Sequence, residues 1–96
     1  MIKRFVKMTF KAEHIEDFKT LFASKKDLIA AVEGCRSVEL LQDIDDETIF
    51  FTYSIWEDPK YLEAYRNSEL FAGVWAKTKV LFADKAQAWS LKEITN

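Results

Sequence analysis

ETIFFTYSIW, residues 47–56, is the stretch that decides which fold we expect. Successive side chains of a β-strand point to opposite faces of a sheet. One face of this strand would carry the even-numbered residues from Phe50 to Trp56, and the other would carry the odd-numbered residues from Ile49 to Ile55. Both sets are largely apolar, which is typical of a strand that is covered on both sides. Both faces of the sheet that contains this strand must therefore be buried, although the chain has only 96 residues.

The residues before this strand predict a strand, a helix and a second strand. Residues 2–11 alternate in polarity, with Ile2, Val6, Met8 and Phe10 on the apolar side, and predict a strand with one buried face. Residues 13–33 repeat apolar side chains at intervals of three and four, which indicates a helix. Gly34 is the expected helix stop, and residues 37–43 predict the next strand.

The residues after it predict a second helix and a closing strand. Asp58 can cap a helix whose first residue is Pro59, and residues 61–82 keep helical spacing. Residues 66–68 contain the poor helix formers Asn67 and Ser68, so we expect this helix to bend near these two residues. Residues 85–94 predict the last strand.

This order of elements, βαββαβ, predicts an α+β protein of the ferredoxin-like fold, with a four-stranded antiparallel sheet and two helices on one face. The sequence has no linker, so we expect one domain over residues 1–96. The helices cover one face only, and the other would expose the odd-numbered residues of 49–55 together with Phe5. Such an apolar patch favours association, so we expect a homodimer that packs sheet against sheet.

Composition argues against several other classes. The net charge of −2 comes from interleaved acidic and basic residues, without the basic stripe of a nucleic-acid-binding protein. No segment is long and apolar enough for a membrane span, the start lacks the apolar run of a signal peptide, and we expect a cytoplasmic protein. Cys35 has no partner for a disulfide. With one histidine, one cysteine and two isolated glycines, neither a metal site nor a phosphate-binding loop is expected.

Two segments carry a resemblance to a known family: YSIWEDPKYLEAYRNSELFAGVW at residues 53–75 and KVLFADKAQAWSL at residues 79–91. They resemble the antibiotic biosynthesis monooxygenase (ABM) domain family, whose members are small dimeric α+β barrels. The resemblance implies a pocket between the sheet and the helices. It also implies oxygenase chemistry without metal or flavin, in which an electron-rich aromatic substrate loses a proton and passes an electron to oxygen.

The haem-degrading branch of that family is not expected here. Its members use an asparagine on the first strand and a tryptophan and a histidine on the second helix. The corresponding helix positions here are Tyr65 and Trp75, and residues 2–11 contain no asparagine. The chain therefore lacks an obvious axial ligand for haem iron.

Candidate catalytic residues are few. Tyr65 lies on the inward stripe of the second helix, where its hydroxyl could hold a substrate anion. His14 is the only histidine and is either a general base or an exposed residue at a helix start. Trp56 and Trp75 are either pocket walls or ordinary core residues.

Polar residues near the pocket have two interpretations as well. Asn67, Ser68 and Ser90 could hydrogen-bond a substrate, although Ser68 is also a good cap for a helix that restarts after a bend. Arg66 could pair with an anionic substrate or simply lie on the helix surface. The sequence thus suggests a cofactor-independent monooxygenase for a small aromatic or quinol-like compound. The alternative is a non-catalytic dimer of the same fold that binds a small molecule or another protein.

Overall fold

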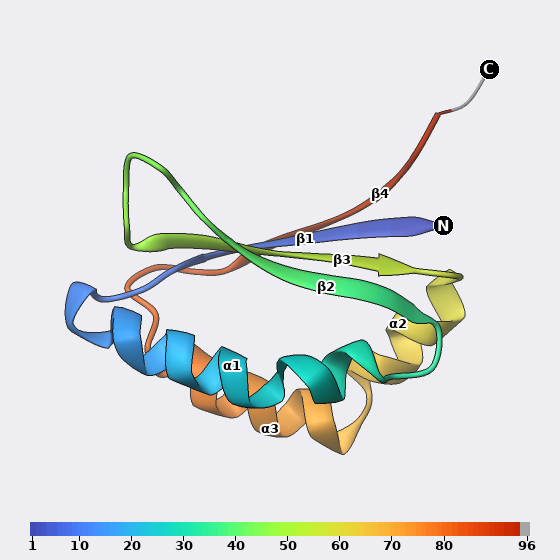
Figure 1. Ribbon diagram of the computed structural model, residues 1–96, viewed down its shortest axis with the longest axis horizontal. Coiled ribbons are helices and arrows are strands. Elements are labelled where there is room, and N and C mark those ends of the chain that lie inside the picture. The colour runs from blue at the N-terminus through green and yellow to red at the C-terminus, as the bar shows by residue number, and fades with distance from the viewer. Residues whose placement is uncertain (95–96) are drawn as a thin grey trace.

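Four antiparallel strands form one sheet in the computed structural model of this chain, which describes residues 1–94 (Figure 1). The spatial order is β2-β3-β1-β4. The strands are β1 Ile2–Thr9, β2 Cys35–Gln42, β3 Ile49–Trp56 and β4 Gln87–Lys92. This topology confirms the predicted ferredoxin-like α+β fold.

The helices all lie on one face of this sheet (Figure 1). A short 3₁₀ helix, η1 Ala12–His14, leads into α1 Ile15–Ala30, and α2 Pro59–Arg66 and α3 Glu69–Lys79 follow β3. Within residues 1–94, none of these helices has the length and apolar character that crossing a membrane requires.

The long helix predicted after β3 is two helices rather than one bent helix. Ser68 is the reason, because its hydroxyl accepts a hydrogen bond from the Phe71 N–H at 3.2 Å and donates one to the Tyr65 carbonyl at 2.6 Å. The same side chain therefore ends α2 and caps the start of α3. At the other end of α2, Asp58 accepts a hydrogen bond from the Lys60 N–H, and Pro59 is the first helical residue, as predicted.

The even-numbered residues of β1 and β3 face the helices. Phe10 and Phe50 are 1% and 2% exposed, and Phe10 stacks on Phe18 of α1 with ring centroids 4.1 Å apart. Met8 lies opposite Phe50 in the β1–β3 register and is buried beside it. These contacts make a closely packed aromatic core under one end of the sheet.

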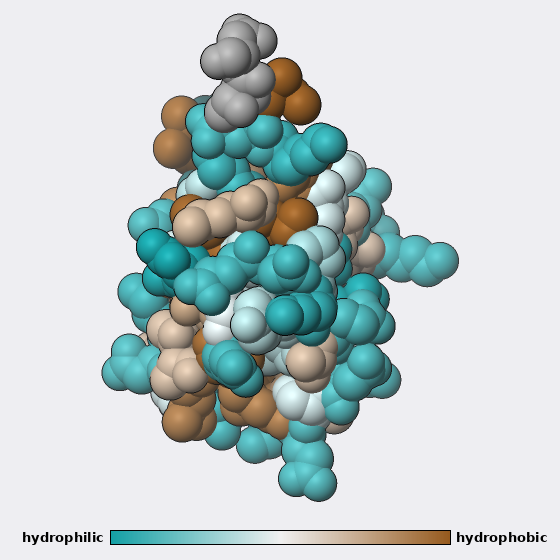
Figure 2. Space-filling model, turned by 90° about the vertical axis from the view of Figure 1, so that its right-hand side faces the viewer, coloured by the Kyte–Doolittle hydropathy of each residue, from teal (hydrophilic) through white to brown (hydrophobic). Residues whose placement is uncertain are grey.

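The odd-numbered residues lie on the face that no helix covers (Figure 1). Phe5 and Tyr53 are paired across β1 and β3, and their rings stack with centroids 4.6 Å apart. On the outer strands, Leu41, Trp89 and Leu91 are 43%, 42% and 49% exposed. Figure 2, which views the molecule end-on, shows brown hydrophobic side chains in its upper part, where this face lies. We call this surface the open face.

Candidate functional site

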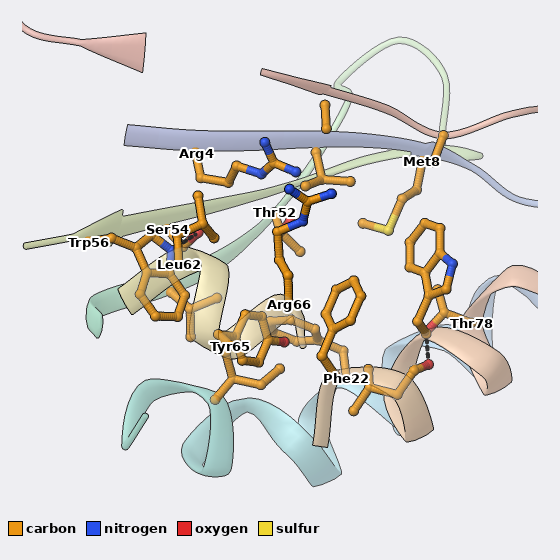
Figure 3. A pocket seen from close by; sticks show the side chains of 18 of the residues that line it. Arg4, Met8, Phe22, Thr52, Ser54, Trp56, Leu62, Tyr65, Arg66 and Thr78 are labelled. Carbon is orange, nitrogen blue, oxygen red and sulfur yellow. Dashed lines mark hydrogen bonds between the residues drawn. The ribbon is translucent and has the colours of Figure 1, made fainter. Parts of the chain in front are cut away.

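A cavity of about 380 Å³ lies between the helix-covered face of the sheet and the helices (Figure 3). Its volume is in the range of small-molecule sites. Side chains from β1, β3, α1, α2 and α3 line it, and most of them are apolar. The cavity and the aromatic core both lie in the layer between the sheet and the helices. Phenylalanine rings fill one part of this layer, and the cavity occupies another part.

Aromatic rings from β3, α2 and α3 form one wall of the cavity. Trp56 stacks on Tyr65 with centroids 5.2 Å apart, and Tyr65 meets Phe71 edge to face at 5.3 Å. Phe71 in turn stacks on Trp75 at 6.0 Å. Each ring in this series packs against its neighbour, so the wall presents flat apolar surfaces to the cavity.

Trp56 anchors this wall to the sheet. Its indole is only 1% exposed, and its Nε1–H donates a hydrogen bond of 3.0 Å to the hydroxyl of Ser54 on the same strand face. A buried indole N–H without an acceptor is destabilising, and Ser54 supplies that acceptor. The indole nitrogen is therefore engaged within the protein.

Tyr65 offers a phenolic hydroxyl to the same space. Figure 3 shows this hydroxyl pointing into the cavity, and no hydrogen bond joins it to another of the residues drawn there. Burial raises the pKa of Tyr65 to about 12, with a smaller contribution from the nearby Cys35 thiol. The hydroxyl is thus protonated near neutral pH and can donate a hydrogen bond but cannot act as a base.

Three predicted site residues, Trp56, Tyr65 and Trp75, are brought together around the cavity. His14 is not among the residues that line it. His14 lies in η1, half-buried, and its Nδ1 is 2.9 Å from a carboxylate oxygen of Asp17 one turn along. The structure therefore gives His14 a local partner at the start of α1 and separates it from the aromatic wall.

The predicted polar residues have structural partners. Asn67 is exposed at the end of α2, and its side-chain amide lies 3.4 Å from a carboxylate oxygen of Glu63. Ser68 uses its hydroxyl in the caps described above. Ser90 lies on β4 and accepts a hydrogen bond of 2.8 Å from Arg4. None of these three residues lines the cavity, although Ser90 contacts a residue that does.

Arg4 is the site residue that the sequence analysis missed. It lies on the helix-facing side of β1 and lines the cavity together with Arg66 from the end of α2. Its position could have been noticed, because residue 4 has the same parity as Val6 and Met8 on an otherwise apolar strand face. A charged residue at such an inward position is unusual and indicates a specific partner.

The surroundings of Cys35 disfavour its thiolate form. Burial raises its pKa, and a hydrogen bond with the Ser37 backbone offsets this only in part. A raised pKa reduces the thiolate population, and the thiolate is the nucleophilic form.

The fold and the cavity define a ferredoxin-like α+β domain with an aromatic-walled internal site. The model of the family described as antibiotic biosynthesis monooxygenase (ABM) matches residues 1–76, and the chain belongs to this family. The match includes β3, α2 and most of α3, which together carry the aromatic wall.

Solved structures share this fold. A crystal structure of an antibiotic biosynthesis monooxygenase superposes with a TM-score of 0.92 at 17% sequence identity, covering 99% of this chain and 100% of that one. A conserved protein from Methanosarcina mazei Go1 gives 0.92 at 18% identity over 97% and 92% of the two chains. Rv0793 from Mycobacterium tuberculosis gives 0.89 at 15% identity over 99% and 96%. A search of curated proteins found no match to the sequence.

Proposed function

We propose that this protein is a monooxygenase that acts, without metal or flavin, on a small aromatic or quinol-like substrate held in the cavity. The observation that carries the proposal is the aromatic wall of Trp56, Tyr65 and Trp75 beside a free, protonated Tyr65 hydroxyl. A cavity of this volume accommodates a ligand of roughly two or three fused rings. Membership of the ABM family supports oxygenase chemistry in such a cavity.

The reaction requires little acid–base chemistry from the protein if the substrate is easily ionised. In an anthrone, the CH₂ group between the rings loses one proton, and the resulting anion passes one electron to O₂. Joining of the two radicals and loss of water then converts CH₂ and O₂ into a carbonyl and H₂O, with no external reductant. A Tyr65 hydroxyl that donates to the oxygen of the anion would stabilise its negative charge in an apolar site.

Oxygen consumption tests this proposal. Anthrones and hydroquinones would be supplied to the protein in an oxygen electrode, with product formation followed by absorbance. We expect turnover above the rate without protein, and a loss of about a hundredfold in kcat for Tyr65→Phe because a donor to the developing charge is removed. Tyr61→Phe is the matched control, since Tyr61 packs against Gly34 and lies outside the cavity lining. Uptake at the uncatalysed rate across the panel would contradict the proposal.

A second candidate is a non-catalytic binding protein of the same fold. It is favoured by the ionisable groups that line the cavity, which are Arg4, Tyr65 and Arg66. Guanidinium groups and a phenol of raised pKa do not accept protons near neutral pH, so none of them is a general base. In this case Tyr65→Phe would weaken ligand binding by only about 1 kcal/mol.

The open face supports a proposal about assembly. The stacked Phe5–Tyr53 pair lies within a band of exposed apolar side chains on this face, which no helix covers. We propose that a second copy of the chain covers it, forming a homodimer by sheet-to-sheet packing.

A further inference from the structure

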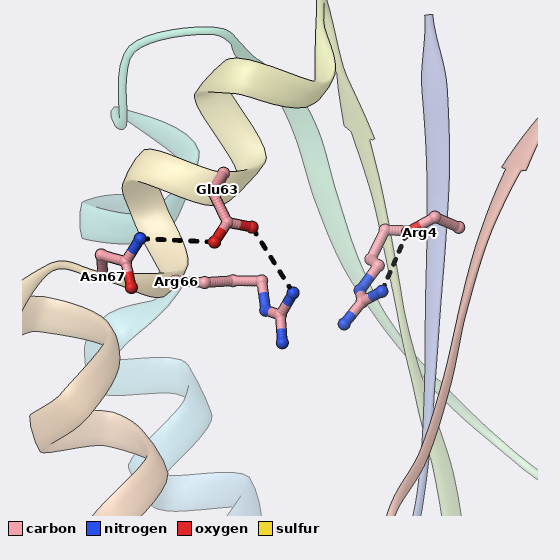
Figure 4. Close-up of polar contacts among 5 residues, drawn as sticks. Arg4, Glu63, Arg66 and Asn67 are labelled. Atoms are coloured by element: carbon pink, nitrogen blue, oxygen red, sulfur yellow. Dashed lines mark hydrogen bonds and ion pairs between the residues drawn. The ribbon is translucent and has the colours of Figure 1, made fainter.

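Two guanidinium groups lie at one side of the cavity. Arg4 projects from β1 and Arg66 from the last residue of α2, and both line the cavity. Figure 4 shows the two side chains extending toward each other from opposite walls, and Figure 3 shows them above the Tyr65 ring. Elements far apart in the sequence therefore bring two positive charges to the same place.

Within residues 1–94, Arg4 has no carboxylate within ion-pair distance. Its Nη1–H donates to the Ser90 hydroxyl at 2.8 Å, which orients the group but leaves its charge uncompensated. Burial lowers the pKa of the Arg4 guanidinium, and the positive charge of Arg66 lowers this pKa further. Guanidinium groups nevertheless remain protonated at neutral pH, so the repulsion between the two is present in the folded protein.

Among the residues that the structure describes, Arg66 forms an ion pair with Glu63, one turn earlier on α2. The nitrogen-to-oxygen distance is 3.7 Å, and both side chains are about half exposed or more. An exposed pair at this separation is weak, because it exceeds hydrogen-bond length and water screens it. Glu63 also accepts a hydrogen bond from Asn67 through its other carboxylate oxygen, so its negative charge is shared between two partners (Figure 4). The space between the two arginines thus remains positive.

We propose that Arg4 and Arg66 together bind the carboxylate of an aromatic acid whose rings lie against Trp56 and Tyr65. Two guanidinium groups present several parallel N–H donors, which suit the two oxygens of a planar carboxylate. The apolar wall beside them suits the rings, and the Tyr65 hydroxyl is left for a second oxygen on the ring system. This inference rests on the proposed function in using the same cavity, and it names the substrate class as aromatic carboxylates.

Binding of two ligands that differ only in charge tests the inference. 2-Naphthoate and 2-naphthamide have almost the same shape, neither is oxidised by this chemistry, and both can be titrated by calorimetry or tryptophan fluorescence. We expect naphthoate to bind the wild-type protein about tenfold more tightly, because hydrogen bonds to a charged acceptor are stronger. This preference should shrink as salt is added, since the cavity is open to solvent at the arginines.

Variants assign the preference to the two arginines. Arg4→Met and Arg66→Met should each reduce naphthoate affinity about tenfold and naphthamide affinity clearly less, because the bond to a neutral amide oxygen is weaker. Measurable naphthamide binding by a variant also shows that its cavity is intact. Arg4→Gln, which keeps a donor for Ser90, serves if Arg4→Met folds poorly. Arg36→Met is the matched control, because Arg36 pairs with Glu57 at 3.0 Å and does not line the cavity.

Equal affinity for the two ligands, no measurable binding of either, or a preference that survives in both arginine variants would overturn the inference. These outcomes are independent of catalysis. Naphthoate preference without oxygen uptake would support the carboxylate site and contradict the monooxygenase proposal. Oxygen uptake with neutral substrates, but no preference for naphthoate, would support the monooxygenase proposal and contradict the carboxylate site.

Discussion

Burial of Tyr65 between Trp56 and Phe71 makes its phenol a weaker acid, with a pKa of about 12 instead of the ordinary 10. Tyrosinate absorbs at 295 nm, so the difference between the titrations of the wild type and Tyr65→Phe isolates this group. We expect that difference to have its midpoint near pH 12. A midpoint at or below 10 would show that the ring is solvated, and would remove the argument that the hydroxyl is a fixed donor.

The same shift links Tyr65 to stability. Its pKa is higher in the folded state than in the unfolded chain, so its stabilising contribution is complete below pH 10 and is lost as the pH rises toward 12. The free energy of unfolding should therefore fall more steeply over this interval in the wild type than in Tyr65→Phe.

At the level of single residues, the sequence identified the aromatic wall and named Arg66 as a possible partner of an anionic substrate, but it did not identify Arg4. Trp56, Tyr65 and Trp75 were predictable because strand parity and helical spacing both point them inward. Arg4 was not included because polarity alone assigns arginine to the surface. Its inward direction follows from parity on β1, but its approach to Arg66 depends on how α2 packs on the sheet, which no local pattern encodes.

Among the elements, the turn between α1 and β2 depends on one glycine. Gly34 has a φ of 81°, and a Cβ added there would lie 2.1 Å from Cγ of Tyr61 on α2. Gly34→Ala should therefore destabilise the protein by more than about 1 kcal/mol, combining backbone strain with displacement of a ring. Urea unfolding at a fixed protein concentration measures this loss.

Gly73, unlike Gly34, has room for a larger side chain. It lies inside α3, and a Cβ there would meet no atom within 4 Å. Gly73→Ala should stabilise the protein by about 0.5–1 kcal/mol, because alanine is the better helix former. If both substitutions changed stability in the same direction, the structural contrast between these two glycines would be wrong.

Elements were more predictable than their boundaries. Alternation on residues 2–9 and 49–56 fixed which face of the sheet meets the helices, because a shift of one residue would bury lysines. The sequence predicted a bend in the second helix, whereas the structure has two separate helices, α2 and α3. Helical spacing continues through Ser68, whereas its hydroxyl bonds to both Tyr65 and Phe71 and makes a true end and a new start.

For the whole molecule, the sequence predicted one layer of helices and one face without cover. The distribution of charge supports this arrangement, because Lys3 and Lys7 flank Phe5 on the open face and mark the limits of the apolar band. The aromatic residues on both faces of β3 are explained if both faces of the sheet are buried. A strand that meets helices on one side and a second sheet on the other has no polar face.

If the open face is buried by a second copy of the chain, the protein is a dimer, and its oligomeric state can be measured. Light scattering should give a mass near twice the 11.2 kDa of one chain at micromolar concentration. Phe5→Glu places a charge beside Tyr53 in the centre of the open face, and we expect it to yield a folded monomer because burying an unpaired carboxylate is costly. Leu28→Glu, at a position 54% exposed on α1, should keep the wild-type mass. A monomeric wild type, or a Phe5→Glu variant of unchanged mass, would mean that the open face meets water, and the apolar band would then need another occupant.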